Sequence, residues 1–324
     1  FDGGTTVRKQ VNILLHALNG ALLMWLLSLL LAHAGVPRHQ LFALLGAALW
    51  LFSPLYVSTV LYIVQRMAML STLFILASCI VYCYWRRVLF RSPAGYACFA
   101  LLSGCIALAA FSKENGLLAV PLIVVLEVLW FGGRDRRGHV DPVLRRYSLA
   151  ALFGGALAAV AILLYASDWI VRSFSNRDFT VTERIMTQAR VVWDGVGQLL
   201  WPELPRMGVF HDDYLVSTSL TQPPVTLVAV IAWVFLAVTC TALLRWRAGQ
   251  LVVCGVLFFL VGHALESTVF SLELYFEHRN YLPGVGLFLL VLGALGSVAA
   301  RWPRTAAPLL AWLCVWLVLL AAQT

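Results

Sequence analysis

Residues 148–166, SLAALFGGALAAVAILLYA, decide the class of this protein. The stretch carries no charged side chain and has about the length that an α-helix needs to cross a bilayer. Similar stretches recur along the chain. Of its 324 residues, 61% are apolar and 12% are charged, about half the charge of a soluble domain. Because such a chain cannot hide its apolar surface from water, the composition excludes a soluble enzyme, a disordered chain and a nucleic-acid-binding domain.

We therefore predict an all-α, polytopic transmembrane bundle, since helices satisfy their own backbone hydrogen bonds in lipid. Ten apolar stretches are candidate spans: 11–34, 40–53, 68–85, 96–111, 116–132, 148–166, 226–244, 250–265, 283–299 and 306–322. The 40–53 stretch is short, and we expect Pro54 to end it because proline lacks the backbone donor of a further turn.

Basic residues divide unevenly between the two sides of this bundle. One side holds thirteen Lys and Arg and two acids, whereas the other side holds ten Lys and Arg and twelve acids. The arginine-rich side consists of 35–39, 86–95, 133–147, 245–249 and 300–305. The positive-inside rule places this side in the cytoplasm and the other side outside.

Three parts follow from this topology. Residues 1–166 form an N-terminal bundle, 167–225 a long outer loop, and 226–324 a C-terminal bundle with a further outer loop. In the long loop, Thr180 and Glu183 have the spacing of a capping box. We expect a helix to begin there and to continue through 183–200 as an amphipathic helix along the membrane surface.

Three cations on the outer side, Arg66, Lys113 and Arg279, come from separate hairpins. A charge at the membrane boundary is costly unless it is paired or hydrated, and arginine's planar fork matches phosphate oxygens. We predict that the three side chains converge on an anionic lipid headgroup. The alternatives are a solvated loop with internal ion pairs and cations that snorkel to the interface.

Two further motifs are weaker. His211-Asp212-Asp213 offers a general base or a metal-ligand pair, although turn chemistry explains adjacent aspartates equally well. His16 and Asn19 share one helix face, and we expect them to bond a neighbouring helix rather than a ligand. Nucleotide-binding and zinc-hydrolase motifs are missing from the sequence, which argues against nucleotide-driven chemistry and zinc hydrolysis. We predict no cofactor and no metal site, because no set of outer carboxylates is compelling, and a divalent metal is the alternative.

In their order and sidedness these motifs resemble those of the GT-C membrane glycosyltransferases. The likeness is greatest to bacterial relatives of the transmembrane and tetratricopeptide-repeat O-mannosyltransferases. Ser53 stands where that family commonly has histidine. The motifs that carry the resemblance are Asn12 to Asn19 with His16, Ser53-Pro54, Gln65-Arg66-Met67, Ser112 to Asn115, Glu127, Glu183-Arg184, Thr187-Gln188, 210–213 and Glu273 to Pro283.

The resemblance implies transfer of a sugar, with inversion, from a polyprenyl-phosphate donor to a protein or glycan hydroxyl at the periplasmic face of a bacterial inner membrane. It implies that the bilayer and these substrates are the partners, and that a tetratricopeptide module follows the last span. The implied phosphate-binding residues are Arg279, Lys113, Arg66 and His278. The implied supporting residues are Glu114, Glu277, Tyr281, His16 and Asn19.

The family's catalytic base is a carboxylate in the first outer loop, which we expect to lie upstream of Phe1. Within the chain, Asp212, Asp213 and Glu273 are weaker candidates for that base.

Two other functions fit the same topology. An O-antigen polymerase or ligase-like enzyme would use a lipid diphosphate donor and basic residues of the long loop: Arg184, Arg190, Arg206 and His211. A non-catalytic transporter or scaffold is the other alternative. A transporter places charged pairs at mid-membrane depth, and the sequence puts only Glu127 clearly within a span.

Overall fold

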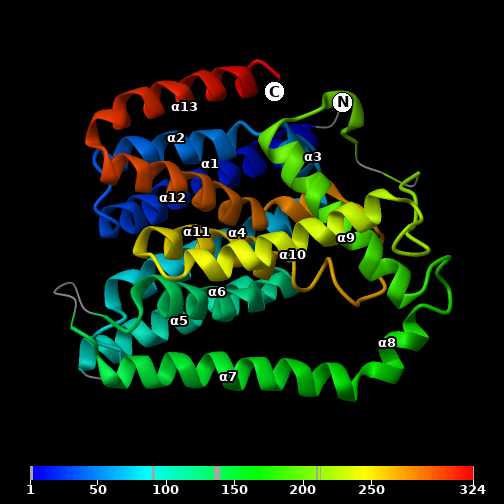
Figure 1. Ribbon diagram of the computed structural model, residues 1–324, viewed down its shortest axis with the longest axis horizontal. Coiled ribbons are helices and arrows are strands. Elements are labelled where there is room, and N and C mark those ends of the chain that lie inside the picture. Colours follow the sequence, from blue (N-terminus) through cyan, green and yellow to red (C-terminus); the bar gives the residue numbers. More distant parts are fainter. Residues whose placement is uncertain (1–2, 90–91, 135–138, 209–210, 212, 324) are drawn as a thin grey trace.

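The computed structural model describes residues 3–89, 92–134, 139–208, 211 and 213–323. Within these ranges the secondary structure is helical, and the extended pairings are two isolated bridges, Arg134 with Val140 and Ser219 with Gln222. Most of the long helices run in roughly the same direction through the molecule, as Figure 1 shows. The predicted all-α class is confirmed.

The helices follow one another along the chain, and the longest connections join α9 to α10 and α11 to α12. The α-helices are α1 (Gly3–His33), α2 (His39–Leu51), α3 (Val57–Leu61), α4 (Arg66–Trp85), α5 (Pro93–Ser112), α6 (Ala119–Val125), α7 (Pro142–Tyr165), α8 (Ser167–Ser173), α9 (Val181–Leu200), α10 (Val225–Leu243), α11 (Arg247–Gly262), α12 (Pro283–Arg301) and α13 (Ala306–Ala321). The tighter 3-10 turns are η1 (Pro54–Tyr56), η2 (Ile63–Gln65), η3 (Glu114–Leu118), η5 (Leu204–Arg206), η6 (Glu277–Asn280) and η7 (Pro303–Thr305), and a π-helical turn, η4 (Leu126–Phe131), extends α6.

In the described part of the chain, eight helical segments are long and apolar enough to cross a membrane. The predicted stretches 40–53 and 250–265 do not reach that length as straight helices. The first corresponds to α2, which ends before Pro54 and forms a pair with η1–α3 bent by 51°. The second corresponds to the shorter apolar helix α11. The structure thus supports a helical membrane protein with eight such helices, or nine if the bent pair is one span.

The core lies between α1, α2, α4, α11 and α12, where large apolar side chains are fully buried. α11 and α12 pack so closely that a Cβ on Gly286 would lie 2.2 Å from the backbone nitrogen of Phe259. Small residues permit this approach, which is how helices commonly associate in lipid. By contrast, α7 runs along the lower edge of Figure 1 with Ser148 as its one buried residue.

The helix α9 begins where the capping-box spacing predicts. The hydroxyl of Thr180 accepts a hydrogen bond from the Glu183 backbone, and the Glu183 carboxylate accepts one from the Thr180 backbone. The predicted stretch 283–299 corresponds to α12, which begins at Pro283, a first helical position where proline is well tolerated. The helices α3, α8 and α9 lie toward one end of the bundle, at the right of Figure 1.

Candidate functional site

A small polar cavity is enclosed where α4, the turn after α5, and the segment between α11 and α12 meet. Its volume is about 10 Å³, which is room for about one water molecule. Two of the predicted phosphate-binding cations, Lys113 and Arg279, line it together with the predicted His278. The remaining lining residues are Ala68, Ser71, Thr72, Asn115, Glu266, Tyr281 and Leu282.

Lys113 is buried and paired. Its Nζ donates to Oε1 of Glu266 at 2.5 Å, and Nδ2 of Asn115 donates to the other carboxylate oxygen at 2.8 Å. Gly116 makes this turn feasible, because a Cβ there would lie 2.0 Å from the carbonyl carbon of Ala109. The tight turn therefore presents the ammonium of Lys113 and the amide of Asn115 to the carboxylate of Glu266, which lies about 150 residues further along the chain.

The combined effect of burial and nearby charges lowers the pKa values of two groups of the cavity, Glu266 and His278. Burial raises the pKa of the Glu266 carboxyl, but the charge of Lys113, its hydrogen bond and the charge of Arg279 bring that pKa below its ordinary value. Burial and the charges of Lys113 and Arg279 lower the pKa of His278 to about 4. His278 is therefore neutral at pH 7, and it can meet a phosphate as a hydrogen-bonding group but not as a cation.

Arg279 is buried among backbone carbonyls. Its Nη1 donates to the carbonyl oxygen of Glu273 at 2.6 Å, and its guanidinium lies 5.2 Å from the ring centre of Phe276. Among the residues that the structure describes, its Nε has no hydrogen-bond partner, and neither does the hydroxyl of Ser71 on the α4 side of the cavity. Buried polar atoms are nearly always bonded, so these two atoms are available to a polar group that enters the cavity.

Arg184 of α9 holds the segment that carries these residues. Its guanidinium donates to the carbonyl oxygens of Glu266, Thr268, Leu272 and Glu273. Burial, together with the charges of Arg279 and Arg177, lowers the pKa of Arg184 to about 10. Arg184 thus fixes a loop that lacks regular secondary structure, rather than facing an open cavity.

The hydroxyl of Tyr281 joins α1 to the cavity wall. It forms a hydrogen bond of 2.8 Å with Nδ1 of His16 and accepts one of 3.3 Å from Nδ2 of Asn19. Nδ2 of Asn19 also donates to the carbonyl of Met69 on α4. The expectation that His16 and Asn19 bond neighbouring helices is confirmed.

Five predicted residues lie outside the lining of this cavity: Arg66, Glu114, Glu277, His16 and Asn19. Arg66, at the first position of α4, donates to Oδ1 of Asn12 at 2.9 Å and to the carbonyl of Arg8 at 3.0 Å. Glu114 is exposed at the start of η3. The predicted convergence of three cations is therefore seen for Lys113 and Arg279, whereas Arg66 binds α1.

A larger and more open pocket of about 410 Å³ lies beside α9. Glu277 connects it to the η6 turn, since Oε1 of Glu277 lies 3.5 Å from Nε2 of His211. Oε1 also accepts from the backbone nitrogen of Gly208, and Oε2 accepts from Ser58. The pocket lining includes Arg190, Gln198, Arg206, His211, Asp213, Tyr214 and Tyr275.

The candidate bases are dispersed. Asp213 is exposed on the 410 Å³ pocket, and Glu273 is half exposed in an ion pair of 2.5 Å with Arg177. Asp212 lies outside the described residues. Across residues 3–89, 92–134, 139–208, 211 and 213–323, no group of three or more His, Cys, Asp and Glu is placed to hold a metal ion.

A second buried ion pair lies at the opposite, arginine-rich end of the bundle. Glu127, in the π-helical turn η4, pairs with Arg86 at the end of α4 and accepts a hydrogen bond of 2.8 Å from Tyr82. The backbone nitrogen of Gly133 donates to the same carboxylate. Glu127, the acid predicted to lie within a span, is therefore paired with an arginine at the end of the neighbouring helix α4.

Sequence reasoning missed Glu266, Asn115 and Ser71 as members of the site. Glu266 carried the clearest signal, since it follows the 250–265 stretch directly and is an acid at a membrane boundary. Ser71 carried none, because a serine in an apolar helix is common. The site has the composition of an anion-binding cluster at the end of a helical membrane bundle. No protein-family model matches the chain, and no curated protein or solved structure matches it either.

Proposed function

We propose that this protein is an integral-membrane glycosyltransferase of the GT-C type that takes its sugar from a polyprenyl-phosphate donor. The acceptor is a protein or glycan hydroxyl. The proposal places the arginine-rich side in the cytoplasm and the Lys113 cavity at the periplasmic face of a bacterial inner membrane, following the positive-inside rule.

The observation that supports it most is the shared cavity of Lys113, Arg279, His278 and Glu266. Two buried cations with one carboxylate between them leave positive charge for a ligand anion. Unpaired atoms on Arg279 and Ser71 add donors that a phosphate oxygen can use. Glu266 is the anion that Lys113 and Asn115 hold in the structure.

The cavity volume constrains the binding step. About 10 Å³ is too small for a phosphate group, so the donor must displace the Glu266 carboxylate or move the η6 turn away from α4. The apolar chain of the donor would then lie among the spans, where its transfer from water is favourable.

The reaction needs one base and one stabilised leaving group. A carboxylate accepts the proton of the acceptor hydroxyl, and the acceptor oxygen forms a bond to the anomeric carbon. The bond from that carbon to the phosphate oxygen breaks, and its electron pair leaves on the phosphate. Lys113 and Arg279 stabilise the charge that develops there. Asp213 and Glu273 are the candidates for this base in the described residues.

The test is turnover of a polyprenyl-phosphate sugar by the full-length protein in detergent or nanodiscs. Lys113→Ala and Arg279→Ala should each lower turnover by about 10²–10³-fold, as removal of one charge-stabilising donor commonly does. Arg172→Ala, in which an exposed arginine of α8 is lost, is the matched control and should retain activity. Folded Lys113 and Arg279 variants with wild-type turnover would refute the proposal.

The 410 Å³ pocket favours a second candidate, an O-antigen polymerase or ligase-like enzyme with a lipid diphosphate donor. Arg190, Arg206 and His211 of the long loop line this pocket. For such an enzyme, Arg190→Ala and Arg206→Ala should reduce activity more than Lys113→Ala. A transporter or scaffold would show no turnover with either donor, and a scaffold would retain no polyprenyl phosphate in native mass spectrometry.

A further inference from the structure

The turn between α5 and η3 offers two side-chain donors to a single buried carboxylate. Nζ of Lys113 and Nδ2 of Asn115 bond the two oxygens of Glu266. An ionised carboxylate has two acceptor oxygens and one negative charge. The phosphate of a polyprenyl-phosphate sugar is a diester, and it also has two unesterified oxygens and one negative charge. Glu266 therefore presents to this turn the charge and the acceptors that the donor phosphate would present.

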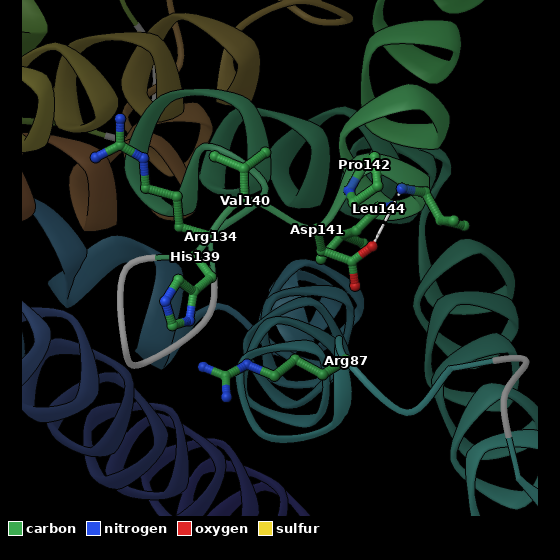
Figure 2. Close-up of a pocket in the computed structure, with 8 residues that line it drawn as sticks. Arg87, Arg134, His139, Val140, Asp141, Pro142 and Leu144 are labelled. Carbon is green, nitrogen blue, oxygen red and sulfur yellow. Dashed lines mark hydrogen bonds between the residues drawn. The ribbon is translucent and has the colours of Figure 1, made fainter.

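A carboxylate with a structural role in this protein bonds different groups. Asp141 at the start of α7 accepts from the backbone nitrogens of Val143 and Leu144 and so caps the helix, a contact that Figure 2 draws. The bonds of Glu266 come instead from an ammonium and a side-chain amide. These donors belong to side chains and not to the backbone of a helix, so another anion can use them.

The backbone at Glu266 is held more firmly than its side chain. Nη2 of Arg184 donates to the carbonyl oxygen of Glu266 at 2.9 Å. One residue further on, the backbone nitrogen of Ser267 donates to the carbonyl oxygen of His263 at 2.9 Å. Because these bonds fix the main chain, a phosphate can replace the carboxylate when the Glu266 side chain rotates, while the loop stays in place.

Rotation of this carboxylate changes the charge of the cavity. Lys113 and Arg279 line the same cavity, and the carboxylate that Lys113 holds is that of Glu266. Once the carboxylate leaves, both cations and the hydroxyl of Ser71 face the entering group. Two buried cations without an anion are costly, so only an anionic ligand can take the carboxylate's place.

We propose that Glu266 is an internal substitute for the donor phosphate. Its carboxylate holds Lys113 and Asn115 until the phosphate of the donor replaces it, and it returns between them after transfer. The product is a phosphate monoester, which carries a charge of about −1.5 to −2 at pH 7 and attracts the two cations more strongly than the diester does. The returning carboxylate competes with this product and speeds its release. The inference rests on the proposed function for the identity of the ligand.

The experiment measures binding of farnesyl phosphate to the full-length protein by native mass spectrometry, with farnesol as the uncharged probe. Glu266→Gln keeps the size of the side chain and removes its charge. Farnesyl phosphate should then bind at least about tenfold more tightly, as expected when a competing state that holds about 90% or more of the molecules is lost. Binding of farnesol should not change.

Asp178→Asn is the matched control, because it removes an exposed acid from the same side of the bundle but outside the cavity. It should change the affinity for farnesyl phosphate by less than about twofold, since exposed charges are screened. An equal gain in Asp178→Asn and Glu266→Gln would overturn the proposal as a general charge effect.

Glu266→Asp decides the question if Glu266→Gln does not fold. It keeps the charge and shortens the side chain by one methylene, so the carboxylate holds Lys113 and Asn115 less well. Farnesyl phosphate should again bind more tightly, by a smaller factor than in Glu266→Gln. Unchanged or weaker binding in a folded variant would overturn the proposal and would make the Lys113–Glu266 pair purely structural.

Sugar transfer separates this inference from the proposed function. With a polyprenyl-phosphate sugar as substrate, Glu266→Gln should lower both KM and kcat, because the donor binds more tightly and the product leaves more slowly. Wild-type turnover without a gain in farnesyl phosphate affinity in Glu266→Gln would refute the inference alone. A gain in affinity in a protein that transfers no sugar would refute the transferase and leave Glu266 as the competitor of a phosphate ligand.

Discussion

Within the part of the chain that the structure describes, two buried ion pairs lie one toward each end of the bundle, and they are built differently. Arg86 and Glu127 lie at the arginine-rich end, and Lys113 and Glu266 lie at the end where α3, α8 and α9 gather. All four side chains are at least nine-tenths buried. The difference is in how completely the surroundings use their hydrogen-bonding capacity.

The Arg86–Glu127 pair is complete. The carboxylate accepts from Arg86 twice, from the Tyr82 hydroxyl and from the Gly133 backbone, and the remaining arginine nitrogen donates to the carbonyl of Arg134. A buried charge that is paired and fully hydrogen-bonded is tolerated in a low-dielectric interior. We interpret this pair as a structural link between α4 and η4.

The residues around the Lys113–Glu266 pair leave some of their hydrogen-bonding atoms without a partner, so we call this cluster incomplete. In the lining of its cavity, Arg279 Nε, Ser71 Oγ and Asn115 Oδ1 have no partner. An unsatisfied buried polar atom costs about 1–3 kcal/mol, which a purely structural cluster would avoid. The two pairs therefore differ in the hydrogen-bonding groups left unused beside them, and not in burial or charge.

The largest effect expected from this comparison is a loss of unfolding free energy when the Arg86–Glu127 pair is broken. Glu127→Ala leaves Arg86 buried without its carboxylate, and arginine cannot lose its proton, so we expect a loss of about 3–5 kcal/mol. Unfolding in mixed micelles titrated with sodium dodecyl sulfate measures it. Asp168→Ala, at an exposed acid of α8, is the control. A loss no larger than that of the control would make the Arg86–Glu127 pair dispensable.

Lys113→Met should cost less than Glu127→Ala, because the buried Glu266 that remains can take up a proton. The substitution should also reverse the pH dependence of the stability that Glu266 contributes. In the wild type the pKa of Glu266 is below its ordinary 4.5, so its contribution is present above pH 4.5 and is lost as pH falls through the folded pKa. Without Lys113, burial raises that pKa, and stability falls instead as pH rises above 4.5. Unfolding midpoints between pH 4 and 7 test the sign, and an unchanged pH profile contradicts the assignment.

Tyr82→Phe tests one bond of the complete pair. The hydroxyl donates to a carboxylate, and such bonds contribute about 1.5–3 kcal/mol. We expect the loss of unfolding free energy to fall in that range. Tyr165→Phe, at the exposed last position of α7, should change stability by less than about 0.5 kcal/mol. Equal effects in both variants would argue against a special role of the Tyr82 hydroxyl.

The smallest effect should come from the incomplete cluster. Ser71→Ala removes a buried hydroxyl that has no partner, so unfolding free energy should stay within about 0.5 kcal/mol or increase. Ser78→Ala, at a buried serine of the same helix whose hydroxyl donates to Ile75, should cost about 0.5–1.5 kcal/mol. A larger loss for Ser71→Ala than for Ser78→Ala would mean that the Ser71 hydroxyl does have a stabilising partner.

Much of the fold was predictable because it depends on local pattern. Apolar length identified the helices, including the start of α12 at 283, and the Thr180–Glu183 spacing located the start of α9. The same reasoning overestimated 40–53 and 250–265, because composition does not show where a helix bends or how long its regular part is. Pro54 marked the bend at α2, but its 51° angle depends on packing.

The candidate site was predictable by residue type but not by pairing. Charge at a membrane boundary identified Lys113 and Arg279, which do share a cavity. The partner of Lys113 could not be deduced, because Glu266 lies on a hairpin about 150 residues away and any of several outer acids would serve equally well by sequence. The bonds of Arg66 to Asn12 and Arg8 likewise depend on how α1 meets α4, which local pattern does not specify.

The hydrogen bonds of Arg184 have a consequence for how mutagenesis of this protein should be interpreted. One guanidinium supplies the donors that a neighbouring strand or helix turn would normally offer to the 266–273 backbone. An alanine scan that monitors activity alone would rank Arg184 beside Lys113 and Arg279, although its hydrogen bonds go to backbone carbonyls. Proteolytic susceptibility of 266–273 separates the cases: it should rise in Arg184→Ala and remain low in Lys113→Ala.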